Sequence, residues 1–250
     1  MFKEIKILSQ HGIQYVPDLK GAILTPLFRG RPVIQDNITS AEAEMIQKLC
    51  PSDAIVRENG FGIDLGKCVF CKECSFACPD KIEFTNDYKI ASNDRNNLIV
   101  RSGDTGIKFN EEILRPDVRK FFKNSLKLRQ VSAGGDSSCE IELNAAGNVN
   151  FDMGRFGIEF VASPRHADGV VITGPITENM AEALQICYDA IPAPKIIILV
   201  GTDAISGGIF ENSPAIKREF LEKYQVDLYM PGNPTHPLTF INGILSLIGK

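Results

Sequence analysis

The sequence contains one dense run of cysteines, Cys68-Val-Phe-Cys71-Lys-Glu-Cys74-Ser-Phe-Ala-Cys78-Pro79. Its four thiols follow one another at intervals of three, three and four residues, and a proline closes the run. This spacing is typical of bacterial iron–sulfur sites, because soft thiolates at this pitch can surround a compact cluster. A zinc site, the alternative, more often uses two separated Cys-x2-Cys pairs. We therefore expect the run to hold one 4Fe-4S cluster.

The rest of the composition is that of an ordinary globular protein. The chain has 250 residues, 44% of them hydrophobic and 23% charged, with a formal net charge of −4, which gives no indication of nucleic-acid binding. Seven cysteines, four of them crowded together, argue against a disulfide framework and for a reducing compartment. The longest apolar run spans residues 196–200, far short of the ~20 residues of a membrane helix. We expect a cytoplasmic protein without direct membrane insertion.

An internal repeat surrounds the cysteine run. The triplet Leu49-Cys50-Pro51 is echoed 28 residues later by Ala77-Cys78-Pro79. The same shift places Cys68, Cys71 and Cys74 on Ser40, Ala43 and Ile46, so three thiols of a second site are missing. This pattern resembles a two-cluster ferredoxin that has kept its pseudo-twofold fold but only one cluster. Residues 41–49 are then expected to form a plain helix that buries Met45, Ile46 and Leu49.

The repeat also determines the expected ligand set. In two-cluster ferredoxins the fourth cysteine of each run binds the cluster of the other run. By that rule Cys50, Cys68, Cys71 and Cys74 hold the surviving cluster, and Cys78 becomes a buried free thiol. Ligation by Cys78 is the alternative. In that case Cys50 would be a small apolar residue at the end of a helix.

The chain divides into four expected segments. They are an N-terminal arm (1–30), a ferredoxin-like 4Fe-4S module (31–92), a linker with a helix near its end (93–125) and an α/β domain (126–250). The arm either lies on a neighbouring subunit or packs on the second domain of its own chain. The fold is thus expected to combine an α+β module with an α/β domain.

The last segment has the alternation that is typical of a flavodoxin-like parallel sheet covered on both faces. We predict strands over 158–161, 170–173, 196–200 and 226–230, and helices over 177–190, 214–224 and 237–248. The first helix carries Met180, Leu184, Cys187 and Ile191 at helical spacing, so Cys187 is expected in the core. The second is expected to begin at Ser213-Pro214 and to bury Ile216, Phe220 and Tyr224.

Several blocks in this segment resemble one family. The blocks are Ser163-Pro-Arg-His-Ala-Asp168, Thr173-Gly-Pro175, Gly207-Gly-Ile-Phe210 and Val226-Asp-Leu-Tyr-Met-Pro-Gly232. They resemble the small subunit of group 4 membrane-bound nickel–iron hydrogenases and formate hydrogenlyases, which is similar to the 20 kDa subunit of respiratory complex I. The resemblance covers about residues 125–245. It implies a subunit that associates with a hydrogenase-like large subunit and membrane-arm subunits, peripheral on the cytoplasmic face of a membrane.

At the cluster site of that family this sequence departs from the pattern. Family members hold a proximal 4Fe-4S cluster with four cysteines, and the matching positions here are Asp136, Cys139, Asp203 and Asn233. Oxygen ligands suit iron–sulfur chemistry poorly, so we expect no cluster in this domain. The four side chains either bind a hard cation, or the three oxygen-bearing ones hydrogen-bond loop amides.

Catalytic residues are not expected, and two functions remain open. His166 is expected to be structural and His236 to lie in a surface turn, and neither has the context of triad chemistry. The first function is an electron-transfer subunit of a hydrogenase-like or complex I-like oxidoreductase. The second is a non-redox assembly or coupling subunit with a structural or sensing cluster. The metal-binding cysteines of the partner subunit, and hydrogen-dependent dye reduction, would distinguish them.

Overall fold

A five-stranded parallel sheet forms the centre of the larger half of the molecule in the computed structural model, which describes residues 2–12 and 14–250. The strands are β6 (Leu126–Ser132), β7 (Ile158–Phe160), β8 (Gly169–Thr173), β9 (Ile196–Val200) and β10 (Leu228–Met230). Their spatial order is β10-β9-β8-β6-β7, and all four pairings are parallel. This is the 2-1-3-4-5 order of flavodoxin-like sheets, in which the direction of winding reverses between β6 and β8.

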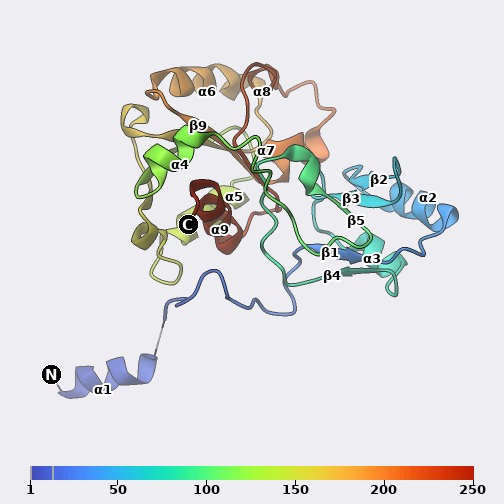
Figure 1. The fold of residues 1–250 in the computed structure, drawn as a ribbon, viewed down its shortest axis with the longest axis horizontal. Helices are drawn as coiled ribbons and strands as arrows, with labels where there is room; N and C mark the ends of the chain where they lie inside the picture. Colours follow the sequence, from blue (N-terminus) through green and yellow to red (C-terminus); the bar gives the residue numbers. More distant parts are fainter. Residues whose placement is uncertain (1, 13) are drawn as a thin grey trace.

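Helices cover both faces of this sheet (Figure 1). One face carries α6 (Glu178–Ala190) and α8 (Glu219–Lys223), and the other carries α4 (Pro116–Phe122), α5 (Ser138–Ala146) and α9 (Pro237–Ile248). Successive strand residues therefore enter different cores. In β8, Val170 packs toward α6 and Val171 toward α9, and both are fully buried. The predicted mixed α/β architecture with a parallel sheet is confirmed.

Several predicted elements are confirmed with small shifts at their ends. The four predicted strands correspond to β7, β8, β9 and β10, and the first and last predicted helices correspond to α6 and α9. In α6, Leu184 is buried, and Met180 and Cys187 pack half-buried against the same core. Cys187 is thus a core residue, as its spacing indicated.

Other parts of this domain differ from the prediction. The strand β6 was not predicted, and α5 and α7 (Thr202–Ser206) occupy stretches that read as loops. The helix expected from residue 214 is reduced to α8, because Ile216 forms a bridge with Thr177 and Lys217 donates its amide to Ile176. Of its expected buried stripe, only Phe220 is fully buried.

Residues 31–101 contain two small antiparallel sheets and two α-helices. One sheet joins β1 (Pro32–Ile34) to β4 (Ile82–Phe84), and the other joins β2 (Ile55–Val56), β3 (Gly62–Asp64) and β5 (Ile99–Arg101). The helices are α2 (Ser40–Leu49) and α3 (Glu73–Ala77), which contact each other. The first part of the expected linker therefore belongs to this unit, since it supplies β5 and the 3-10 turn before it, whereas α4 at its end packs on the parallel sheet.

The internal repeat has a counterpart in the structure. Cys50 ends α2 and Cys78 ends α3, so the two echoed cysteines occupy the same position on their helices. Ala43 and Ile46, which stand where the shift places Cys71 and Cys74, are buried in α2. The expectation that Met45 and Leu49 point inward is wrong, because their side chains are 43% and 46% exposed.

The N-terminal arm has two parts. Helix α1 (Phe2–His11) buries no residue and lies away from the rest of the chain (Figure 1). Residues 14–30 run along the body, where Tyr88 Oη and Asn242 Nδ2 both donate to the carbonyl oxygen of Leu19. For this second part, packing on the chain's own domain is the correct interpretation. Within residues 2–12 and 14–250, no helix has both the length and the apolar character that crossing a membrane requires.

Candidate functional site

Four cysteines from both halves of the repeat line one small pocket. Cys50 comes from the end of α2, Cys68 and Cys71 from the loop before α3, and Cys74 from α3 itself. The remaining lining is mostly apolar and comes from Ser52, Ala54, Ile55, Ile63, Val69, Lys72, Glu73 and Phe84. Cys78 is buried at the end of α3 and faces Glu42 and Lys81 instead. The four cysteines that line the pocket are the ones that the repeat predicts as ligands.

The loop backbone turns amide groups toward the sulfurs. Phe70 and Lys72 have φ values of 54° and 71°, left-handed conformations that make the chain curl back on itself. As a result Phe70 N donates to Cys68 Sγ at 3.3 Å. On the other side of the pocket, Ala54 N donates to Cys50 Sγ, also at 3.3 Å. Amide hydrogen bonds to sulfur are one of the ways in which proteins set the potential of an iron–sulfur cluster.

Burial makes these thiols poor acids on their own. It raises the pKa of Cys68 far above its ordinary value and raises the pKa of Cys74 to about 12, and neighbouring thiols add to both shifts. A thiolate in such an apolar pocket needs a nearby cation, which the irons of a cluster provide. Four thiols around one pocket, two with amide donors, are a donor set that fits a 4Fe-4S cluster.

No group of three or more His, Cys, Asp or Glu side chains in the described chain is spaced to bind one metal ion. This holds for the four-cysteine pocket as well. Because a cluster of four irons is wider than a single ion, its ligands stand farther apart than those of one ion. The assignment of Cys50, Cys68, Cys71 and Cys74 as ligands stays a prediction that this geometry favours.

The second predicted site lies at the carboxyl ends of the parallel strands. Asp136 and Cys139 stand at the start of α5, which follows β6, and Asp203 stands in α7, which follows β9. Burial raises the pKa of Cys139 to about 11 and also raises the pKa of Asp203, with Asp136 and Glu140 adding charge repulsion. Asn233 is exposed and lines a separate pocket with Phe28, Phe70 and His236 among others. Three of the four predicted positions therefore come together.

The side chains at this edge were expected to hydrogen-bond loop amides, and only one does. Asp136 Oδ1 accepts from the amide and the hydroxyl of Ser138 at 2.9 and 2.6 Å, which anchors the start of α5. In residues 2–12 and 14–250, neither the Asp203 carboxylate nor the Asn233 side-chain amide forms a hydrogen bond, so for them the expectation is wrong. The hard-cation interpretation gains no support, since these groups are not spaced around one ion. With a single thiol, the donor set does not fit an iron–sulfur cluster.

Glu140 is a residue of this edge to which the sequence patterns assigned no role. Its Oε1 accepts from Ser132 Oγ at 2.5 Å and from Thr173 Oγ1 at 2.7 Å. Because these hydroxyls end β6 and β8, the carboxylate ties the first turn of α5 to the point where the sheet reverses its winding. No local pattern marks Glu140, since its partners come from two different strands.

The four-cysteine pocket is fastened to the same edge of the sheet. The fully buried hydroxyl of Thr202 donates to the Cys68 carbonyl at 2.8 Å and lies 3.3 Å from the Gly232 carbonyl. Lys67, next to Cys68, forms an ion pair of 2.7 Å with Glu211. The first turn of the cysteine loop thus rests directly on the loops after β9 and β10.

The two histidines to which the sequence analysis assigned roles lie in different environments. His166 is exposed in a short 3-10 turn. His236 is not a surface turn residue, because its side chain is half-buried between the rings of Phe28 and Phe151. Its Nδ1 accepts from the Leu238 amide and caps α9. Burial lowers the pKa of His236 to about 4, which keeps the ring neutral at pH 7 and suits this capping role.

Comparisons with known proteins show which family the sheet domain is similar to. Residues 137–247 match the family model described as NADH ubiquinone oxidoreductase, 20 Kd subunit. The chain is 34% identical over 131 residues to a probable membrane-bound hydrogenase subunit, mbhJ, of Pyrococcus furiosus, covering 52% of this chain and 78% of that protein. It is 43% identical over 117 residues to a subunit of the NADH-quinone oxidoreductase of Clostridium beijerinckii, covering 46% of this chain and 69% of that protein.

A solved structure gives a further comparison. A chain of the membrane-bound sulfane sulfur reductase, an archaeal respiratory membrane complex, is 30% identical, with a TM-score of 0.46. The comparison covers 54% of this chain and 75% of that one. The match to the hydrogenase subunit decides the assignment, because it covers 78% of that protein at 34% identity. The chain belongs to the family of the 20 kDa subunit of NADH:ubiquinone oxidoreductase.

Proposed function

We propose that this chain is an electron-transfer subunit of a hydrogenase-like, complex I-related membrane complex, with one 4Fe-4S cluster in a ferredoxin-like N-terminal module and none at the sheet edge. The observation that carries the proposal is the pocket shared by Cys50, Cys68, Cys71 and Cys74, with backbone amides directed at two of the sulfurs. When bound, the cluster supplies one-electron chemistry.

The protein's own contribution is to position and shield this site. The mostly apolar lining buries the Cys68 thiol and partly buries the other three, and the amides of Ala54 and Phe70 stabilise negative charge on sulfur. Thr202 and the Lys67–Glu211 ion pair hold the pocket against the sheet edge. The pocket is therefore joined by direct contacts to the domain that defines the family.

The partners and the location are part of the proposal. Relatives are named as subunits of a membrane-bound hydrogenase and of NADH-quinone oxidoreductase. We expect this chain to bind a hydrogenase-like large subunit and membrane-arm subunits, peripheral on the cytoplasmic face of the membrane. The absence of a membrane-spanning helix among the described residues is compatible with such an attachment.

The cluster content is tested by iron and labile-sulfide analysis together with EPR of the reduced protein. About four irons, about four sulfides and one spin system per chain are expected for one 4Fe-4S cluster. Two interacting clusters would show that the sheet edge also holds iron. Protein purified anaerobically without iron or sulfide would contradict the proposal.

The ligand set is tested by two matched substitutions. Cys50→Ser removes a thiol that lines the pocket, so the cluster should be lost or converted to a form with fewer irons. Cys78→Ser changes the equivalent cysteine of the repeat, which faces Glu42 and Lys81, and should leave iron content and the EPR spectrum unchanged. The reverse result would assign Cys78 as the fourth ligand.

A second function is favoured by the sheet edge itself. The resemblance places a cluster where Asp136, Asp203 and Asn233 now stand, so a path for electrons through this edge lacks its metal centre. A non-redox assembly or coupling subunit, with a structural or sensing cluster, would have this composition. Hydrogen-dependent dye reduction by the purified complex separates the two, because only the electron-transfer function requires it. A large subunit without metal-binding cysteines would favour the assembly function.

A further inference from the structure

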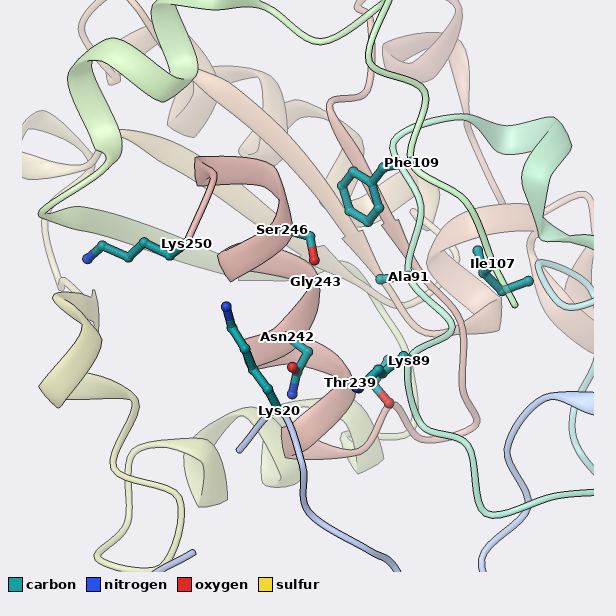
Figure 2. Close-up of a pocket in the computed structure, with 10 residues that line it drawn as sticks. All are labelled: Lys20, Lys89, Ala91, Ile107, Phe109, Thr239, Asn242, Gly243, Ser246 and Lys250. Carbon is teal, nitrogen blue, oxygen red and sulfur yellow. The ribbon is translucent and has the colours of Figure 1, made fainter. Parts of the chain in front are cut away.

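A cavity of about 260 Å³ opens beside α9 and is separate in its lining from the four-cysteine pocket (Figure 2). Its residues come from the N-terminal arm, the stretch after β4, the segment before α4, and α9. They are Lys20, Lys89, Ala91, Ile107, Phe109, Thr239, Asn242, Gly243, Ser246 and Lys250. The proposed function leaves this cavity without a role.

The floor of the cavity is an unusual face of α9. This helix is otherwise apolar, yet Thr239, Asn242, Gly243 and Ser246 recur at helical spacing and line the cavity together. Two of these side chains fix the walls. Thr239 Oγ1 donates to the Tyr88 carbonyl at 2.8 Å, and Asn242 Nδ2 donates to the carbonyls of Leu19 and Leu238. The cavity is therefore held open by buried hydrogen bonds that join α9 to the segments carrying Lys20 and Lys89.

The rim carries two ammonium groups without partners. Lys20 runs along α9 beside Asn242, and Lys89 lies next to Thr239 (Figure 2). In the part of the chain that the structure describes, neither ammonium group forms an ion pair or a hydrogen bond. The carboxylate of Asp18 interacts electrostatically with both ammonium groups, and it also accepts the Lys20 backbone amide at 2.9 Å.

Lys250 plays a different part. Its ammonium donates to the Phe156 carbonyl at 3.1 Å, and its side chain points away from the other lining residues (Figure 2). The available positive charge of the cavity is thus that of Lys20 and Lys89.

The remaining wall is apolar. Ala91 is buried, and Ile107 and Phe109 are half-buried along the cavity. A small inorganic anion would fill only part of a space of about 260 Å³. A ligand that fits both charge and shape therefore has an anionic group joined to an apolar or aromatic group.

We propose that this cavity binds a phosphate-bearing ligand. Its phosphate pairs with the ammonium groups of Lys20 and Lys89 and accepts from the Ser246 hydroxyl, and its apolar or aromatic part packs on Ile107 and Phe109. A phosphate monoester suits two lysines, because it carries close to two negative charges at pH 7 and several acceptor oxygens. The same chemistry is offered by a soluble phosphate monoester and by the phosphate-monoester headgroup of phosphatidic acid.

Calorimetric titration of the purified full chain with phenyl phosphate tests the soluble form. We expect saturable binding that weakens about tenfold for Lys20→Gln and again for Lys89→Gln, since each removes one charged hydrogen bond. Lys223→Gln on α8, on the opposite face of the sheet, removes the same charge and should bind as the natural protein does. Ser246→Leu fills the cavity and leaves both lysines in place, so it should also abolish binding.

Flotation with vesicles tests the lipid form. Vesicles containing phosphatidic acid, whose headgroup is a phosphate monoester, are compared with pure phosphatidylcholine vesicles. They should carry the protein in a way that depends on Lys20 and Lys89 if the ligand is a headgroup. Lysine-dependent binding of phenyl phosphate without such flotation identifies a soluble ester. The proposal is overturned if neither probe binds at millimolar concentration, or if binding is unchanged in the Lys20→Gln/Lys89→Gln double variant or in Ser246→Leu.

Discussion

Replacing Thr202 by valine should loosen the cysteine loop from the parallel sheet. Thr202 is 1% exposed, and its hydroxyl donates to the Cys68 carbonyl at 2.8 Å. Valine has nearly the same shape, so the variant removes the hydrogen bond without opening a cavity. A typical hydrogen bond contributes about 1 kcal/mol, and leaving a buried carbonyl unsatisfied costs about 1 to 3 kcal/mol. For a chain of this length that corresponds to a fall in Tm of roughly 2 to 10 °C.

The experiment compares Thr202→Val with Thr202→Ser, which keeps the hydroxyl. Both are measured anaerobically by thermal unfolding followed with circular dichroism, and by the rate at which a chelator removes iron. We expect Thr202→Val to unfold earlier and to lose iron faster, and Thr202→Ser to stay close to the natural protein. Equal stability and equal iron loss in the two variants would refute the idea that this hydroxyl fastens the cysteine loop to the sheet.

Three further predictions concern stability. Ile46→Ala should lower the free energy of unfolding by about 2 to 5 kcal/mol because Ile46 is fully buried, whereas Met45→Ala should cost less than about 1 kcal/mol; urea denaturation distinguishes them. The pKa of His236 is lowered to about 4, so the unfolded chain binds a proton before the folded chain does, and stability is lost as pH falls from about 6.5 toward 4. His236→Asn, which can still cap α9, should remove about 1 kcal/mol of this loss between pH 7.5 and 5 in thermal unfolding. Glu211→Gln breaks the partly exposed ion pair with Lys67 and should lower stability by at most about 1 kcal/mol, a loss that high salt reduces.

The strands that sequence patterns located well are those whose signal is local. Ile196–Val200 is buried on both faces, and its unbroken apolar run marks it in any context. Strand β6 was missed because Lys127, Arg129 and Gln130 interrupt its apolar residues, although Leu126 and Leu128 are fully buried. Its role as a strand is decided by pairing with β7 and β8, which no short window of sequence contains.

Helix α8 is the opposite case, in which local sequence signals predict more regular structure than forms. The cap-like Ser213-Pro214 pair and the apolar spacing after it favour a helix from residue 214. In the structure the guanidinium of Arg218 instead donates to the carbonyls of Ala204 and Ile205 at the end of α7. These tertiary hydrogen bonds hold Arg218 outside the helix, after a turn and the Ile216 bridge, and they outweigh the modest intrinsic preference for helix.

In the candidate site, too, some features could be predicted from local sequence and others depend on tertiary contacts. The spacing of Cys68, Cys71 and Cys74, and the echo at Cys50, could be read from the sequence because each lies within one repeat unit. The contact between Thr202 and Cys68 could not, since it joins residues 134 positions apart. Close packing of distant loops, rather than any motif, brings the cysteine loop to the sheet edge.

The contact between Thr202 and Cys68 connects the four-cysteine pocket to the edge of the parallel sheet. Thr202 directly precedes Asp203, and Gly232 directly precedes Asn233. The Thr202 hydroxyl lies between the carbonyls of Cys68 and Gly232, so it links the cysteine loop to both of these places. Cys139 packs against the same place, because a side chain added at Gly201 would come within 2.5 Å of its sulfur. The sheet edge that carries Asp203 therefore supports the four-cysteine pocket through the buried Thr202 hydroxyl, so close packing of these loops matters to the pocket whether or not the edge itself holds a metal.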